Sequence, residues 1–331
     1  MKKLINNIDN IVNEMLDGMA CAYPQYLRRL DGYDVVVRAG GSKGKVALVS
    51  GGGSGHEPAH GGYVGKGLLD GAIAGAVFTS PTPDQVYEAI RAADGGRGVL
   101  LVIKNYTGDV MNFEMAADMA RDDGIEVEQV VTADDVAVEN STWTTGRRGI
   151  AGTIFVHKLA GACAEAGGSL QEVKRVAEKV IENVRSMGMA VNACTVPAAG
   201  KPTFDLAEDE VEIGIGIHGE PGVHRQQIAP ADAIVDALLD KILAEGIYHS
   251  GDEVAVIVNG MGGTPLMELY IANRRLNAAL RDKGIIIYRT MVGNYMTSLE
   301  MEGFSITLLK LDDELKALLD APCDAPAWVQ G

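Results

Sequence analysis

The sequence lacks the features that mark membrane-spanning, secreted and nucleic-acid-binding proteins. Its longest apolar runs, such as residues 285–288, are far too short to cross a bilayer, and no apolar stretch follows the two lysines at its start. The four cysteines form no C-x-x-C pair, so we expect reduced thiols and a cytoplasmic protein. No run of lysine and arginine occurs, and the formal net charge is -16, which argues against nucleic acid as a partner.

The 331 residues do contain short β-rich runs that alternate with helical patterns from end to end. Buried strands are predicted at 45–50, 98–105, 125–131, 192–196, 212–219, 253–260, 284–293 and 305–311. Helices are predicted at 111–124, 231–243 and 265–284, and another after the capping box that Ser169 and Glu172 form. This alternation predicts an α/β protein of two α/β domains with largely covered sheets and a ligand pocket at strand ends. We expect the domains to span 1–188 and 189–331.

The most unusual segment is the glycine-rich stretch 50–67, which directly follows a predicted strand. Its backbone can wrap a small polar ligand, or it can be a flexible connection. It fails the dinucleotide fingerprint and the nucleophile elbow because His56 replaces their last glycine, and it fails the phosphate-loop pattern because His60 and Gly67 replace required residues. His56 to His60 match the zinc motif H-E-x-x-H, but Pro58 argues against the helix that this motif needs.

Further candidate residues lie at other predicted element ends. Lys104 can bind a substrate oxygen, and Asp109 is equally suited to be a general base or the N-cap of the following helix. His218 ends a predicted strand and is a possible nucleophile, although a lone histidine is more often structural. Ser80 can cap a helix or face a ligand, and His157 lies in a helical pattern that indicates a structural role.

Several longer motifs carry a resemblance to a known family. They are SGGGSGHEPAHGGYVGKG (50–67), FTSPTPDQ (78–85), IKNYTGDVMNFE (103–114), TTGRRGIAGT (144–153), ACTVPAAGKPTF (193–204), GIGIHGEPG (214–222) and GFSITLLKLDDE (303–314). Together they closely resemble the dihydroxyacetone kinase family, and specifically its ketone-binding subunit. The resemblance extends from the N-terminus to about Asp320.

The resemblance implies a role for each matching residue. His218 is implied to hold the ketone carbon as a hemiaminal, His56 to help handle the reacting hydroxyl, and Asp109 to act as general base. The substrate contacts that it implies are Gly53, Ser54, Gly55, Ser80 and Lys104. It implies no metal on this chain.

The resemblance also implies partners. The family's helical nucleotide domain has no counterpart in the sequence, so the chain is expected to be of the separate-subunit type. ADP or ATP with magnesium is then expected on a helical partner, which a phosphotransferase-system protein recharges, and the ketone-binding subunit is expected to form a homodimer. A ketone sensor or transcriptional coactivator of the same family is the alternative, but a sensor needs no base, so Asp109 favours the enzyme. A zinc hydrolase is a third possibility.

Overall fold

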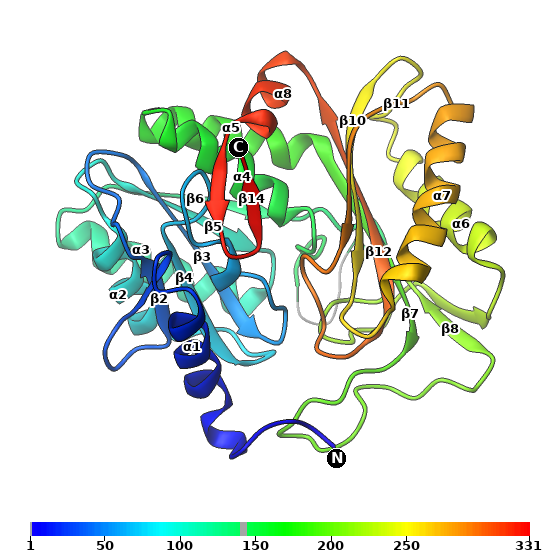
Figure 1. Cartoon of the computed structure of the whole chain (residues 1–331), viewed down its shortest axis with the longest axis horizontal. Helices are drawn as coiled ribbons and strands as arrows, with labels where there is room; N and C mark the ends of the chain where they lie inside the picture. Colours follow the sequence, from blue (N-terminus) through cyan, green and yellow to red (C-terminus); the bar gives the residue numbers. More distant parts are fainter. Residues whose placement is uncertain (1, 140–143) are drawn as a thin grey trace.

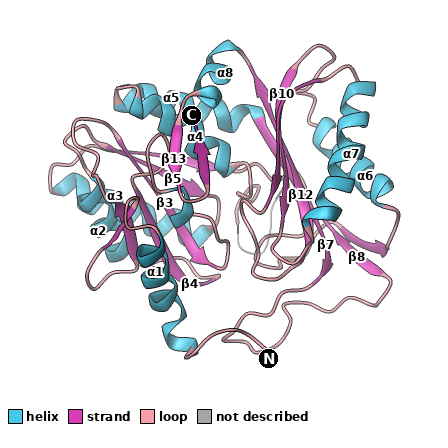
Figure 2. Ribbon diagram, viewed as in Figure 1, coloured by secondary structure: helices cyan, strands magenta, loops and turns pink. Residues whose placement is uncertain are grey.

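The computed structural model describes residues 2–139 and 144–331 and contains two mixed sheets with helices between and outside them (Figures 1 and 2). The first sheet has the strand order β1-β2-β4-β3-β5-β6. Its strands are β1 (Leu27–Arg29), β2 (Val35–Arg38), β3 (Ala47–Ser54), β4 (Gly71–Val77), β5 (Val99–Lys104) and β6 (Val127–Thr132). The last four are parallel, so their carboxyl ends meet at one edge.

The second sheet has the order β11-β10-β12-β7-β8-β9 and is antiparallel except where β10 pairs with β11. Its strands are β7 (Val184–Asn192), β8 (Glu210–Ile213), β9 (His224–Gln227), β10 (Glu253–Gly260), β11 (Ile286–Gly293) and β12 (Glu302–Leu311). A short hairpin of β13 (Cys323–Ala325) and β14 (Trp328–Gln330) packs against the loop at Gly65 and Gly67.

The helices form three layers around these sheets. The outer face of the first sheet packs on α2 (Pro83–Ala93) and α3 (Thr107–Asp122), and that of the second sheet packs on α6 (Ala231–Leu243) and α7 (Leu266–Asp282). Between the sheets lie α4 (Thr153–Glu165), α5 (Leu170–Asn183) and α8 (Asp313–Asp320), in one hydrophobic core with residues of both sheets. The helix α1 (Ile11–Ala22) packs beside β1, β2 and β4. The predicted α/β fold with covered sheets is confirmed.

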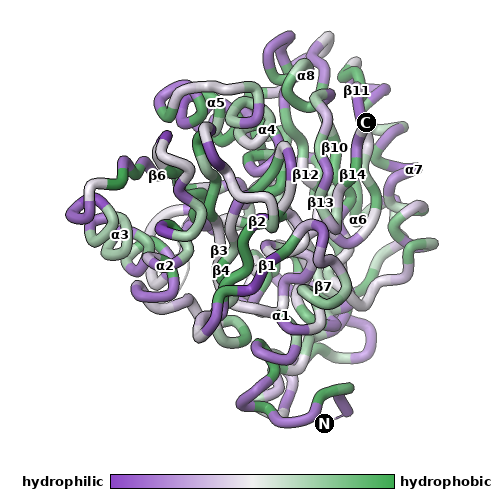
Figure 3. Tube along the Cα trace, turned by 60° about the vertical axis from the view of Figure 1, so that its left-hand side comes forward, coloured by the Kyte–Doolittle hydropathy of each residue, from purple (hydrophilic) through white to green (hydrophobic). Residues whose placement is uncertain are grey.

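The hydrophobic pattern explains these positions. Every residue of β3 and β5 is buried, as expected for central parallel strands. The outer helices carry both hydrophilic and hydrophobic residues, as the purple and green segments along α7 show in Figure 3, and the buried ones recur at helical spacing. In contrast, α4 is buried on almost every side. Ser169 and Glu172 form the predicted capping box of α5. Among the residues that the structure describes, no helix is long and apolar enough to cross a membrane.

Two predicted strands in the second half are wrong in extent. Of the strand predicted at 192–196, only Asn192 lies in a strand, as the last residue of β7. The strand predicted at 212–219 stops at Ile213, because Gly214 has a φ of +80° and turns the chain out of the sheet. His218 therefore lies in a loop and not at a strand end. The expected domain boundary at 188 falls inside β7.

Candidate active site

The ligand pocket lies between the two sheets, where the carboxyl ends of the parallel strands face the loop after β8. It is lined by Gly53, Phe78, Thr79, Ser80, Tyr106, Thr107, Gly108, Asp109, Asn112, Val196 and His218. Four of the predicted site residues are therefore lining residues: Gly53, Ser80, Asp109 and His218. Both halves of the chain contribute to this pocket, so it forms only when the whole chain folds.

His218 is held by a carboxylate two residues further along its loop. Glu220 accepts two hydrogen bonds from it, at Oε1 from the ring Nδ1–H (2.8 Å) and at Oε2 from the backbone N–H (2.9 Å). Burial alone would raise the pKa of Glu220, but His218 and the charge of Arg148 lower it to about 2. Glu220 is thus an ionised acceptor that keeps a proton on His218 Nδ1. The other ring nitrogen, Nε2, is therefore the one that can accept a hydrogen bond or form a bond to a ligand.

His56 is fully buried next to His218, which lines the pocket. Its Nδ1–H donates to the carbonyl oxygen of Thr297 (2.7 Å), and its Nε2 lies 3.0 Å from His218 Nε2. Because both Nδ1 atoms carry protons, both Nε2 atoms would be acceptors, and two acceptors at this distance require a shared proton. Burial and the nearby Lys104 place the pKa of His56 well below its ordinary value.

Asp109 lines the pocket, whereas Lys104 is fully buried beside Asp109 and is not a lining residue. A Cβ built on Gly52 would lie 3.4 Å from both Asp109 Oδ2 and Lys104 Nζ, so both groups approach the chain at this glycine. Burial raises the pKa of Asp109 and lowers that of Lys104, while the attraction between them opposes both shifts. Within residues 2–139 and 144–331, Asp109 Oδ1 and Lys104 Nζ have no hydrogen-bond partner, so each of these buried atoms has unused hydrogen-bonding capacity.

The observed N-caps of α2 and α3 decide whether Ser80 and Asp109 cap these helices, which the sequence left open. The N-cap of α3 is Tyr106, so Asp109 lies in the first turn and is not the cap. The N-cap of α2 is Thr82, so Ser80 is not a cap either. Ser80 instead lines the pocket and hydrogen-bonds the side chain of Asp109, which opposes the rise in the pKa of that carboxyl that burial causes.

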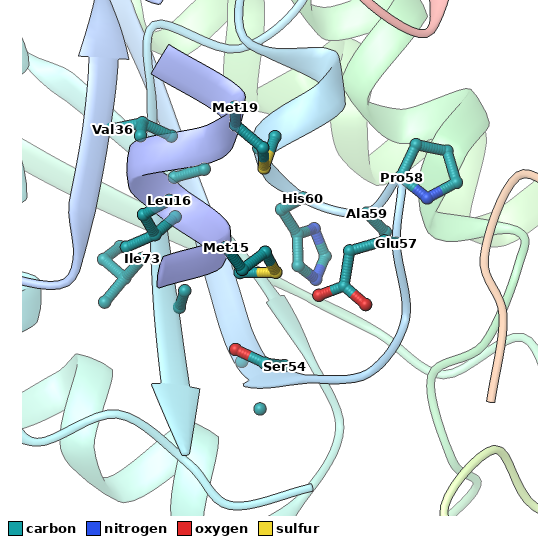
Figure 4. Close-up of a pocket in the computed structure, with 15 residues that line it drawn as sticks. Met15, Leu16, Met19, Val36, Ser54, Glu57, Pro58, Ala59, His60 and Ile73 are labelled. Carbon is teal, nitrogen blue, oxygen red and sulfur yellow. The ribbon is translucent and has the colours of Figure 1, made fainter. Parts of the chain in front are cut away.

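The glycine-rich loop contributes its backbone more than its side chains. A Cβ on Gly53 would lie 2.5 Å from Thr79 N, so only glycine fits where β3 ends against the next loop. Ser54 Oγ donates to Gly75 O (2.7 Å), and Gly55 N–H donates to the Glu57 carboxylate (3.1 Å). Ser54 lines a second, smaller cavity behind the loop, under α1, together with His60 and Met15 (Figure 4).

The two histidines of the H-E-x-x-H motif have different partners. His60 Nδ1 lies 3.0 Å from His157 Nε2, on the far side of the loop from His56. Residues 56–60 form turns and not a helix, so the geometry of a helical zinc motif is absent from this described segment. Across residues 2–139 and 144–331, no three His, Cys, Asp or Glu side chains form a group able to hold a metal ion.

Four contacts of this site were missed in the sequence: Glu220, Thr297, Phe78 and Tyr106. The rings of Phe78 and Tyr106 lie edge-on to His218, with centroids at 5.1 and 4.6 Å. Glu220 stands in the same motif as His218, which was an available signal. Thr297 is 241 residues from His56, and no sequence pattern connects them.

The fold and the site define an α/β protein with two facing histidines, a buried carboxylate and a buried lysine at or beside one pocket. The Dak1 domain family matches residues 17–327. Over 329 residues the chain is 55% identical to the dihydroxyacetone-binding subunit DhaK of PTS-dependent dihydroxyacetone kinase 1 from Listeria innocua, covering 99% of this chain and 100% of the relative. It is 48% identical over 351 residues to the DhaK subunit of the PEP-dependent dihydroxyacetone kinase from Escherichia coli, covering 99% of each. The chain belongs to the Dak1 family and, within it, to the DhaK subunits of dihydroxyacetone kinases, as its motifs predicted.

Two solved structures share the fold at a TM-score of 0.91. The dihydroxyacetone kinase of C. freundii, in complex with AMP-PNP and Mg2+, is 37% identical, and the match covers 99% of this chain and 61% of that chain. The dihydroxyacetone kinase operon co-activator Dha-DhaQ is 38% identical, and the match covers 98% of this chain and 99% of that chain. The same fold therefore occurs in a kinase and in a co-activator.

Proposed function

We propose that this chain is the dihydroxyacetone-binding subunit of a dihydroxyacetone kinase, which holds the ketone as a hemiaminal on His218 and presents its hydroxyl for phosphorylation. The placement of His218 carries the proposal, because this residue lines the pocket while Glu220 binds its Nδ1–H at 2.8 Å. Once the proton shared with His56 leaves Nε2, His218 is a neutral imidazole with a lone pair beside a site for a small ketone.

The capture step balances with the groups present. The proton between the two Nε2 atoms goes to His56, which frees the His218 Nε2 lone pair. This lone pair forms a bond to the central carbon of the ketone, the π pair of the carbonyl moves to its oxygen, and His56 gives that oxygen the proton. The adduct keeps Nδ1–H and one positive charge on the ring, which the Glu220 carboxylate balances. The low pKa of His56 makes it a strong proton donor for this step.

Covalent capture also explains substrate choice. Glycerol has the hydroxyl groups of dihydroxyacetone but no carbonyl, so it cannot form the adduct. Once the ketone is attached, its terminal hydroxyl is fixed near Asp109, which takes the proton as this oxygen attacks the phosphoryl group. Lys104 binds a substrate oxygen and balances the charge of Asp109.

A separate helical subunit is proposed to hold the nucleotide, whose magnesium neutralises charge on the transferred phosphoryl group. We place this subunit over the pocket mouth, along the exposed row Met111, Met115 and Met119 (57, 55 and 41% exposed), which continues down α3 from Asn112 of the lining. The purified chain with ATP and magnesium should then make no dihydroxyacetone phosphate. Stoichiometric ATP binding by the chain alone would contradict the proposal that a separate subunit holds the nucleotide. For the docking surface, Met115→Glu should lower turnover with the partner subunit but leave ketone capture unchanged.

The capture itself is tested with dihydroxyacetone labelled with carbon-13 at its carbonyl. The wild-type chain should convert the ketone resonance into that of a carbon bonded to nitrogen and oxygen, and His218→Ala should not. Ketone bound by the wild-type chain without a change of this resonance would refute the hemiaminal.

A role as a co-activator is the second candidate, because Dha-DhaQ has the same fold. The proposed base separates the two functions. The side chain of Asp109 is 3% exposed and lies beside Lys104. A buried carboxylate with a pKa shifted in this way is suited to proton transfer, whereas a protein that only holds a ketone does not need one. The enzyme is therefore the function that the site supports best.

A further inference from the structure

Arg148 lies fully buried behind the loop that carries His218, although it belongs to the segment after β6. Its guanidinium donates through Nη2 to Gly214 O (2.7 Å) and through Nη1 to Pro221 O (3.4 Å). These two carbonyls lie at the two ends of the loop 214–221. Arg148, from the first half of the sequence, thus hydrogen-bonds both ends of the loop that carries His218.

The other side of Arg148 is itself fixed. Its Nε donates to Asp135 Oδ2 (2.8 Å), and both side chains of this ion pair are 0% exposed. The neighbouring Asp134 accepts hydrogen bonds from the backbone N–H groups of Ile150 and Gly152 (2.8 Å each), which holds the turn just after Arg148. Because the guanidinium is planar and its donors have fixed directions, this anchoring determines where its remaining N–H groups point.

Arg148 also faces the carboxylate that orients His218. A Cβ built on Gly216 would lie 2.0 Å from Glu220 Oε2 and 2.7 Å from Arg148 Nη1, so the carboxylate and the guanidinium approach each other at this glycine. A side chain at position 216 would push them apart. The positive charge of Arg148 thus stabilises the ionised form of Glu220 in a site that water hardly reaches.

We propose that Arg148 is a positioning residue for ketone capture, which holds the loop 214–221 and the Glu220 carboxylate so that His218 Nδ1–H stays bound and Nε2 faces the ketone. Arg148 does not line the pocket, so it acts through Glu220 and not on the substrate. This role rests on the proposed capture of a ketone by His218. A buried ion pair adds little net stability compared with apolar residues, so orientation is the main effect expected of it.

The chain offers a matched control in the adjacent arginine. Arg147 pairs with Glu245 (2.5 Å), away from His218, so Arg147→Met removes one arginine charge from the same segment. Two quantities are measured for wild type, Arg148→Met, Arg148→Lys and Arg147→Met. They are the dissociation constant for carbonyl-labelled dihydroxyacetone and the low-field proton resonance of the His218 Nδ1–H bound to Glu220.

Arg148→Met should weaken capture about tenfold or more and should shift or abolish the His218 resonance, because a charge-assisted hydrogen bond loses its orientation. Arg148→Lys should retain the resonance, and Arg147→Met should match wild type in both measurements. A merely structural role would lower the melting temperature but leave both measurements unchanged in the folded protein. Wild-type capture and an unshifted resonance in folded Arg148→Met would overturn the proposal.

Arg148→Met leaves the Asp135 carboxylate buried and unpaired, and the variant can therefore fail to fold. The double variant Asp135→Asn/Arg148→Met removes both charges and is measured in the same way, with the same losses expected and with wild-type capture again overturning the proposal. If wild-type protein forms no hemiaminal, the proposed function and this role fall together. If wild type and the folded Arg148 variants capture the ketone equally well, only the role of Arg148 falls.

Discussion

Replacing Glu220 by glutamine tests how much of ketone capture depends on the orientation of His218. The carboxylate accepts two hydrogen bonds, one from the ring Nδ1–H (2.8 Å) and one from the backbone N–H of His218 (2.9 Å). Glutamine has almost the same shape but only one oxygen, so its NH2 group must face one of these two donors. The negative charge that balances the cationic adduct is lost as well.

The expected loss follows from these two contacts. A hydrogen bond to a charged group contributes about 1.5–3 kcal/mol, and every 1.4 kcal/mol is about a tenfold change in affinity. Glu220→Gln should therefore raise the dissociation constant for dihydroxyacetone by about tenfold to a hundredfold. Isothermal titration of the purified chain measures it directly, without a partner subunit.

Glu212→Gln is the control for this variant. Glu212 is also buried and accepts hydrogen bonds from Gly222 N–H (2.8 Å) and Arg225 Nε (2.9 Å), but it does not contact His218. Its replacement should cost stability and leave the ketone affinity within about twofold of wild type, because the substrate-facing contacts are intact. Equal affinities for wild type and Glu220→Gln would show that His218 needs no oriented proton on Nδ1.

Two further predictions concern the carboxylates. Asp109→Asn should still capture the ketone but lose about a hundredfold or more in turnover with the partner subunit, the scale of general-base catalysis, and near-normal turnover would remove Asp109 from the mechanism. The pKa of Glu220 is lowered from 4.5 to about 2, so its ionised form stabilises the folded chain above pH 4.5, and this contribution disappears as the pH falls towards 2. The difference in melting temperature between wild type and Glu220→Gln should shrink over that interval, and a constant difference would contradict the linkage.

Regular periodicity made much of the fold predictable. The helix predicted at 231–243 and the strand predicted at 253–260 agree with α6 and β10 at both ends, because each has a clear period and a turn on either side. The helix α4 is buried on nearly all sides and has no polar stripe, so its pattern gave only a weak signal. The short strands β1 and β2 and the helix α1 were not predicted, since they are short or only moderately amphipathic.

The site was predictable as a set of residue types but not as a geometry. Motifs pointed to His56, Asp109 and His218, and the structure brings all three to one region. The hydrogen-bond partners of the two histidines differ in how far the sequence could predict them. Glu220 stands two residues after His218 in the same motif, which was an available signal. Thr297 reaches His56 only when distant segments of the chain pack together, so no sequence pattern could predict it.

The helix layer between the two sheets has a consequence for how the site excludes water. One hydrophobic core joins this layer to both sheets, so the two walls of the pocket cannot swing apart and together about a hinge without breaking that core. The pocket is therefore preformed, and the ketone enters it without a closing movement of the halves. A phosphoryl group presented at an open mouth would be exposed to hydrolysis. We expect the seal to come from outside, so that the surface that delivers the phosphoryl group is also the lid.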